Sequence, residues 1–210
     1  MSDNCPEGPT SYPSDCQLTE GLRKMAANRS PQETIDPLVR ARAEKLELLL
    51  LDVDGVLTDG TLFFSPEGEE SKGFNTQDGF GISMLREAGV DVGVITARSS
   101  KAVSERCQGL QMRYVCQGER DKLVAYKKIA EDSGLKPFQI AYMGDDWLDL
   151  VLLKRVGLAV APANSVAEVR QHVHYVTRRS GGAGAVREVC DLILQAKGLL
   201  DRLLQSYLSR

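Results

Sequence analysis

The sequence Leu48-Leu49-Leu50-Leu51-Asp52-Val53-Asp54-Gly55-Val56 decides the fold of this chain. A short continuous apolar run is typical of a strand buried on both faces, as in a parallel sheet covered by helices. The carboxylates Asp52 and Asp54 follow where this strand must leave the sheet. A buried, unpaired carboxylate costs on the order of several kcal/mol, so a compensating cation is expected. Oxygen ligands without a nearby histidine or cysteine favour a hard divalent ion, Mg²⁺ first.

From Leu46 onwards, short apolar runs alternate with longer amphipathic segments. This alternation predicts an α/β fold with a doubly wound, mainly parallel sheet flanked by helices. The expected strands cover residues 47–53, 91–95, 113–116, 139–143, 157–160 and 175–176. The expected helices cover residues 79–87, 101–108, 122–132, 147–155, 165–171 and 185–208.

The segment 61–74 breaks this alternation. Two short extended runs flank the turn Pro66-Glu67-Gly68 and predict a β-hairpin that projects from the loop after the first strand. A two-stranded flap cannot bury the consecutive side chains Leu62, Phe63 and Phe64 by itself. We expect them to pack either on their own domain or on another subunit.

Residues 1–44 hold five of the eight prolines and little apolar periodicity, which predicts a flexible N-terminal extension. A short helix near residues 36–44 could lead into the domain. Residues 45–210 are then expected to form one domain, and a hydrophobic content of 42% is enough for its core. The last helix, residues 185–208, has one apolar face that packs on the sheet or, in its distal half, reaches a partner subunit.

The formal net charge of −3 disfavours nucleic acid and anionic membranes as partners. No apolar stretch approaches the length of a membrane helix, and the N-terminus lacks the features of a secretory signal, so a cytoplasmic location is expected. The five cysteines include no CxxC pair, which argues against a zinc site or a disulfide framework.

A second acidic cluster, Gly144-Asp145-Asp146-Trp147-Leu148-Asp149, follows the expected strand 139–143. Because the carboxyl ends of parallel strands share one edge of the sheet, this cluster can converge with Asp52 and Asp54. So many carboxylates repel one another unless a metal and a further cation are bound. The candidate cations are Lys122 and Arg98.

The strand 91–95 ends in Thr96-Ala97, which offers a hydroxyl group and free backbone N–H groups at a helix start. Such an arrangement binds anions, particularly phosphate.

The order DxDGV, strand-ending Thr, Lys and GDDxxD resembles the haloacid dehalogenase superfamily of aspartate-nucleophile phosphatases. The resemblance is closest to its capless 3-deoxy-D-manno-octulosonate 8-phosphate phosphatases and covers about residues 46–200. It rests on DVDGVLTDG at 52–60, EESKGFNTQDGFG at 69–81, QGERDKL at 117–123, AYMGDD at 141–146, RVGL at 155–158 and GGAGAVREVCD at 181–191.

The resemblance implies that Asp52 is the nucleophile that forms an aspartyl-phosphate, and that Asp54 is the general acid and later the base. It also implies that Asp52, the Asp54 backbone carbonyl and Asp145 hold Mg²⁺, for which Mn²⁺ or Co²⁺ could substitute. Asp146 and Asp149 would position these ligands or Lys122.

By the same resemblance, the phosphoryl group would be bound by the side chains of Thr96 and Lys122 and by the N–H groups of Gly55 and Ala97. This donor set suits phosphoryl transfer, which needs in-line placement and neutralisation of the equatorial oxygens.

The gaps 59–96 and 122–144 are too short to hold a cap domain. The resemblance implies instead a homotetramer in which the hairpins associate and an adjacent subunit completes each pocket. The implied substrate contacts are Arg98, Arg106, which would reach across the subunit boundary to the substrate carboxylate, and, more weakly, Lys72.

The implied activity releases phosphate from 3-deoxy-D-manno-octulosonate 8-phosphate, in the synthesis of the lipopolysaccharide inner core. One alternative is a phosphatase of nine-carbon keto-sugar acid 9-phosphates or of a broad set of phosphoesters. A remote alternative is a non-catalytic oligomerisation module.

Overall fold

The computed structural model describes residues 20, 35–68 and 70–209 of the chain. Ile35–Arg210 form one compact unit, separate from the residues before them. The flexible extension was expected over residues 1–44. Its residues 1–34, apart from Glu20, lie outside the described residues.

The core of the unit Ile35–Arg210 is a six-stranded sheet in the order β5-β4-β1-β6-β7-β8, and every neighbouring pair is parallel. Its strands are β1 (Leu48–Leu51), β4 (Asp91–Ile95), β5 (Tyr114–Cys116), β6 (Ile140–Met143), β7 (Leu158–Ala161) and β8 (Tyr175–Val176). The predicted fold class, a doubly wound parallel sheet flanked by helices, is confirmed.

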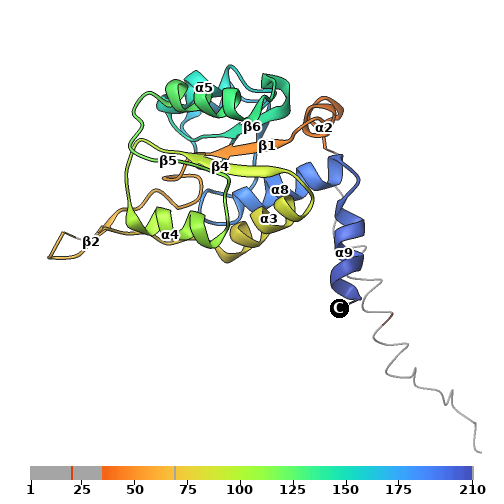
Figure 1. Ribbon diagram of the computed structural model, residues 1–210, viewed down its shortest axis with the longest axis horizontal. Helices are drawn as coiled ribbons and strands as arrows, with labels where there is room; N and C mark the ends of the chain where they lie inside the picture. Colours follow the sequence, from red (N-terminus) through yellow and green to blue (C-terminus); the bar gives the residue numbers. More distant parts are fainter. Residues whose placement is uncertain (1–19, 21–34, 69, 210) are drawn as a thin grey trace, which may run out of the picture. The chain divides into compact units, whose positions relative to one another are not determined.

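Helices cover both faces of this sheet (Figure 1). They are α3 (Thr76–Glu87), α4 (Lys101–Gly109) and α8 (Ala185–Ala196) on one face, and α5 (Lys122–Ser133), α6 (Leu150–Leu153) and α7 (Ala167–Arg170) on the other. The leucines of β1 alternate between the two cores: Leu49 and Leu51 pack in the first, Leu48 and Leu50 in the second. All four are fully buried, which is why the run is continuously apolar.

Helix α2 (Pro37–Ala43) packs on the domain as well. Asp36 caps it, because its Oδ1 accepts a hydrogen bond of 2.7 Å from the N–H of Leu38. Val39 and Ala43 are buried in the same core as α8. The compact unit therefore starts at Ile35 and takes in the short helix that the sequence places at the end of the extension.

The hairpin forms from β2 (Phe63–Phe64) and β3 (Glu70–Ser71), which pair antiparallel and project from the body of the domain (Figure 1). Phe63 is 56% exposed and Phe64 is 60% exposed, so neither packs on its own domain. In the described residues, the segment from β1 to α3 holds only this hairpin, and the segment from α5 to β6 holds one 3-10 turn, η1 (Pro137–Gln139). Neither contains a cap domain.

Two predicted helices are shorter than expected. The segment 147–155 is a 3-10 turn, η2 (Trp147–Asp149), followed by α6, and the segment 165–171 contains only α7. Across the described part of the chain, no helix combines the length and apolarity needed to cross a membrane.

The prediction of one continuous helix over residues 185–208 is wrong. The chain forms α8 and a separate helix, α9 (Leu200–Leu208). Gly198, with φ of +68°, ends α8 in the left-handed conformation. Its N–H donates to the Gln195 carbonyl, and the N–H of Leu199 donates to the Leu194 carbonyl. These bonds satisfy the last carbonyls of α8 and redirect the chain.

We expect Gly198→Ala to lower the free energy of unfolding by about 1 kcal/mol, because a Cβ disfavours the left-handed conformation. No atom lies within 4 Å of the position of that Cβ, so the cost is conformational and not steric. Urea denaturation measures it, with Gly109→Ala as the control, since Gly109 also faces open space but is helical. An unchanged midpoint for Gly198→Ala would contradict this account of the break.

Candidate active site

A pocket of about 250 Å³ opens at the carboxyl ends of β1, β4 and β6. It is lined by Asp52, Asp54, Gly55, Gly60, Thr96, Ala97, Arg98, Lys122, Asp145, Asp146, Leu148 and Asp149. The structure thus brings together residues that lie far apart in the sequence, as the shared edge of a parallel sheet requires. Two of the predicted site residues, Lys72 and Arg106, are not part of this lining.

A buried lysine lies at the floor of the site. The Lys122 ammonium is 2.9 Å from Asp52 Oδ2 and 2.6 Å from Asp149 Oδ1, and its side chain is 2% exposed. Burial by itself would lower the pKa of Lys122, but the charges of Asp52 and Asp149 outweigh it and raise that pKa. Lys122 is therefore held as a cation.

Asp52 is less favourably placed for ionisation than its ion pair suggests. Burial and the charge of Asp149 raise its pKa to about 6, although Lys122 and the N–H of Val53 act in the opposite direction. The Val53 N–H donates to Asp52 Oδ1 at 2.7 Å. One cation is therefore too little for the carboxylates that surround it.

Asp145 shows this shortage of positive charge most clearly. Burial, followed by the charges of Asp149 and Asp52, raises its pKa to about 7. Within the described residues, no hydrogen bond reaches its carboxylate. Gly55 lies directly against it, because a Cβ there would be 2.0 Å from Asp145 Oδ2. Only glycine leaves room for this carboxylate.

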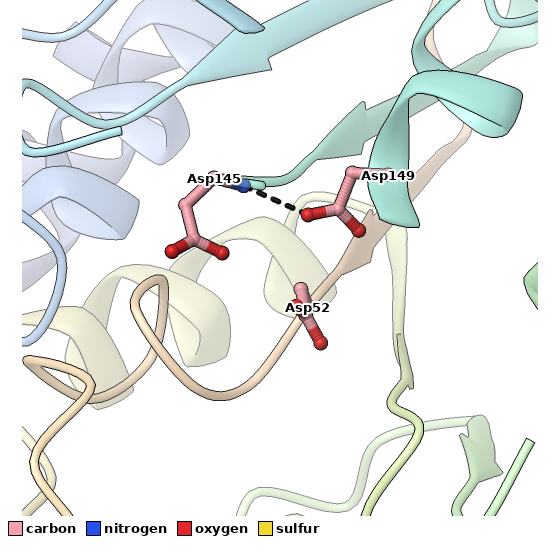
Figure 2. Close-up of side chains that lie close together, drawn as sticks. All are labelled: Asp52, Asp145 and Asp149. Atoms are coloured by element: carbon pink, nitrogen blue, oxygen red, sulfur yellow. Dashed lines mark hydrogen bonds between the residues drawn. The ribbon is translucent and has the colours of Figure 1, made fainter. Parts of the chain in front are cut away.

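Asp52, Asp145 and Asp149 lie close together (Figure 2), with one carboxylate oxygen of each within 4.8 Å of the others. The oxygens of Asp149 are already occupied. Oδ1 accepts from Lys122 and Tyr142, and Oδ2 accepts from the N–H groups of Asp145 and Asp146. Asp52 and Asp145 are therefore the carboxylates with capacity left for a cation, and Asp149 organises the loop around them.

Asp54 belongs to a second charge cluster. The Lys72 ammonium pairs with Asp54 and lies 2.9 Å from Glu70 Oε1. Arg98 pairs with Glu70 and has its Nε 3.7 Å from Asp54 Oδ2. The Lys72 side chain is 1% exposed, so it reaches a pocket ligand only if these pairs open, whereas the Arg98 side chain is 45% exposed.

The expected phosphate-binding groups line the same pocket. Thr96 is buried, and its hydroxyl oxygen accepts a hydrogen bond of 3.3 Å from the N–H of Arg98. Gly55 has φ of +84°, a left-handed conformation that costs glycine little. Ala97 is the second residue after β4, which ends at Ile95.

The side chains of Asp146 and Arg106 bond to neighbouring segments of their own chain. The Asp146 carboxylate caps η2 by accepting from the N–H of Trp147 at 2.7 Å. Arg106 lies on α4, where it donates to the Asn75 carbonyl and stacks on the Phe74 ring at 5.7 Å.

Sequence reasoning missed two groups that shape the site. Tyr142, in β6, touches both Lys122 and Asp149. Asn164 accepts from the N–H of Gly181 at 2.8 Å, and Gly181 packs on the Gly55 carbonyl so closely that a Cβ would lie 1.8 Å from it. The sequence offered one signal for each group. Tyr142 places a hydroxyl group in an otherwise apolar buried strand, and the Gly181-Gly182 pair indicates a close backbone approach.

We expect Mg²⁺ to raise the melting temperature more at about pH 8 than at about pH 5. In the metal-free folded protein, Asp145 and Asp52 take up protons near their raised pKa values of about 7 and 6. The unfolded chain keeps them ionised until the pH nears their ordinary pKa of 3.8. The folded state therefore binds more protons, so these groups destabilise it above pH 7 and are relieved as the pH falls.

Scanning fluorimetry at both pH values, with and without Mg²⁺, measures this effect. Asp145→Asn should lose most of the shift at the higher pH, because it removes one of the two carboxylates with capacity left for a cation. An equal shift at both pH values, or the same shift in Asp145→Asn, would show that the cation binds elsewhere.

The comparisons with known proteins agree with this geometry. Residues 114–188 match the family model of the haloacid dehalogenase-like hydrolases. The chain is 45% identical over 163 residues to the 3-deoxy-D-manno-octulosonate 8-phosphate phosphatase of Escherichia coli, which covers 78% of this chain and 87% of the relative.

Solved structures are similar over the same region. The corresponding phosphatase of Moraxella catarrhalis, in complex with magnesium ion, phosphate ion and a KDO molecule, is 36% identical with a TM-score of 0.79, covering 80% of this chain and 97% of that chain. The cobalt-bound phosphatase of Haemophilus influenzae is 36% identical with a TM-score of 0.76, covering 80% of this chain and 99% of that chain. The chain therefore belongs to the haloacid dehalogenase-like hydrolases, in the family of the 3-deoxy-D-manno-octulosonate 8-phosphate phosphatases.

Proposed function

We propose that this protein is a Mg²⁺-dependent phosphatase that converts 3-deoxy-D-manno-octulosonate 8-phosphate to the free sugar acid and phosphate. The observation that carries the proposal is the pairing of Asp52 with the buried Lys122, beside Asp145, in a pocket that also holds Thr96. The similarity to phosphatases of this substrate supports the choice of sugar acid.

The residues of the site fit a hard divalent cation. Asp52 and Asp145 offer carboxylate oxygens with free capacity, and the Asp54 backbone carbonyl completes the proposed protein ligands. When bound, Mg²⁺ supplies positive charge to the phosphoryl oxygens. The same oxygen donors accept Mn²⁺ or Co²⁺, and a relative has been solved with cobalt.

Asp52 is the proposed nucleophile. One of its carboxylate oxygens attacks phosphorus, the bond from phosphorus to the C8 oxygen breaks, and Asp54 gives its proton to the departing alkoxide. Water then attacks the phosphorus of the aspartyl-phosphate, Asp54 takes the proton of that water, and Asp52 is released with inorganic phosphate. The covalent step divides one difficult displacement into two easier ones.

The remaining lining residues hold the phosphoryl group. Lys122 contributes a fixed positive charge, Thr96 a hydroxyl group, and Gly55 and Ala97 backbone N–H groups. Because the donors are in place before reaction, little reorganisation is needed as charge develops. Asp146 and Asp149 keep the loop after β6 in position.

Substrate selection depends on the basic residues around the opening. Arg98 is partly exposed at the pocket wall and is a proposed substrate contact. Arg106 is proposed to serve a neighbouring subunit, since in its own chain it lies outside the pocket lining. A contact of Lys72 with substrate would replace its present pairs with Asp54 and Glu70.

The proposed assembly is a homotetramer joined through the hairpins, whose exposed phenylalanines need a partner surface. An adjacent subunit would then close a pocket that has no cap. The proposed setting is the cytoplasm, in the synthesis of lipopolysaccharide inner-core precursors.

Phosphate release with Mg²⁺ from a panel of substrates tests the function. We expect kcat/KM to favour 3-deoxy-D-manno-octulosonate 8-phosphate by about 100-fold or more over nine-carbon keto-sugar acid 9-phosphates and hexose phosphates. Asp52→Asn should abolish release, because an amide cannot form the acyl phosphate. Asp91→Asn is the matched control, since Asp91 pairs with Arg113 at the opposite end of β4.

Comparable rates across the panel would retain the phosphatase but reject the substrate. No Mg²⁺-dependent release at all would favour the non-catalytic oligomerisation module.

We expect replacement of both Phe63 and Phe64 by serine to shift the protein from a tetramer to smaller species in light scattering, with a fall in activity. Phe138→Ser is the control, because Phe138 is similarly exposed at 55% but lies on η1, away from the hairpin. A tetramer that survives the double substitution would refute the hairpin interface.

A further inference from the structure

Tyr142 places a hydroxyl group deep inside the site. It belongs to β6 and is completely buried in the core between the sheet and α5. Its oxygen lies 3.1 Å from Lys122 Nζ and 2.6 Å from Asp149 Oδ1. A phenol has one O–H donor and can also accept. The Tyr142 O–H therefore donates to Asp149, and its oxygen accepts from Lys122.

This hydroxyl completes the surroundings of the Lys122 ammonium, which has three N–H donors. Three oxygen atoms lie within reach: Asp149 Oδ1 at 2.6 Å, Asp52 Oδ2 at 2.9 Å and Tyr142 Oη at 3.1 Å. Two of them belong to fully buried side chains, and the third belongs to the proposed nucleophile. Each N–H thus has one partner, and only one points at the reacting carboxylate.

We propose that Tyr142 is a positioning residue that, with Asp149, directs the remaining N–H of Lys122 at Asp52. This rests on the proposed phosphatase function, within which it assigns the tyrosine a task. If Asp149 were the only anchor besides Asp52 itself, the ammonium could rotate about its bond to Asp149. A second fixed acceptor, the Tyr142 hydroxyl, removes that freedom.

Tyr142→Phe isolates this contribution, because it removes one oxygen and leaves the ring in the core. One N–H of Lys122 then lacks its partner, and the ammonium must shift or admit a water. We expect kcat to fall about 10-fold, the order of one hydrogen bond lost from the transition state. KM should change less than about twofold, because the groups that contact the rest of the substrate are untouched.

Tyr126→Phe is the matched control. Tyr126 lies on α5, four positions after Lys122, and packs in the same core as Tyr142. Its hydroxyl group is buried and has no hydrogen-bond partner among the described residues. The control removes the same atom from the same core but removes no hydrogen bond from Lys122, so it should keep the wild-type kcat.

Steady-state kinetics on the sugar-acid phosphate and on p-nitrophenyl phosphate, with circular dichroism at the assay temperature to count folded enzyme, provide the test. The affinity for beryllium fluoride with Mg²⁺, an acyl-phosphate mimic on Asp52, gives a readout that needs no turnover. We expect Tyr142→Phe to bind it about 10-fold more weakly.

A wild-type kcat and beryllium fluoride affinity in Tyr142→Phe would overturn the proposal, as would an equal loss in Tyr126→Phe. A fall in melting temperature without a change in kcat would make the hydroxyl purely structural and would also overturn it. If the wild-type enzyme hydrolyses neither substrate, the proposed function fails, and the beryllium fluoride affinities still decide the role of Tyr142.

Discussion

The ion pair of the buried Lys122 with Asp52 and Asp149 is the interaction on which the rest of the site depends. Several carboxylates share one small pocket, and each would be expensive to ionise there alone. Lys122 offsets part of this repulsion, yet the pKa values of Asp52 and Asp145 remain raised to about 6 and 7. The site therefore has an excess of negative charge. A bound divalent cation compensates that excess and also neutralises charge on the phosphoryl group.

The sheet explains how this arrangement is held. β1 and β6 are neighbours in the sheet, so Asp52 and the loop that contains Asp145 and Asp149 leave it side by side. Both carboxylate oxygens of Asp149 accept hydrogen bonds from groups of the site. Because Gly55 has no side chain, the Asp145 carboxylate can approach the loop after β1. The geometry of the acids is set by backbone and buried side chains, which resist displacement.

The hairpin brings a second constraint to the same pocket. Its first strand exposes Phe63 and Phe64, while Glu70, which pairs with Phe64 across the hairpin, and Lys72 form ion pairs with Arg98 and Asp54. The segment that is proposed to join subunits is thus in direct contact with the proposed general acid. The hairpin contacts the pocket through Asp54 and Arg98, which line it, and not through residues of its own strands.

The sequence alone determined the parallel α/β fold and the convergence of Asp52 with Asp145, because buried apolar runs and the shared edge of a parallel sheet are local and topological rules. The order of motifs, through its resemblance to a known family, added Thr96 and Lys122 to the same site. The sequence did not determine the break at Gly198, since an apolar helical pattern continues across it. Nor did it show that Asp149 is saturated or that Tyr142 reaches Lys122. Tertiary structure decided these points, because hydrogen-bond partners between distant segments depend on distances of a few ångströms that no sequence pattern encodes.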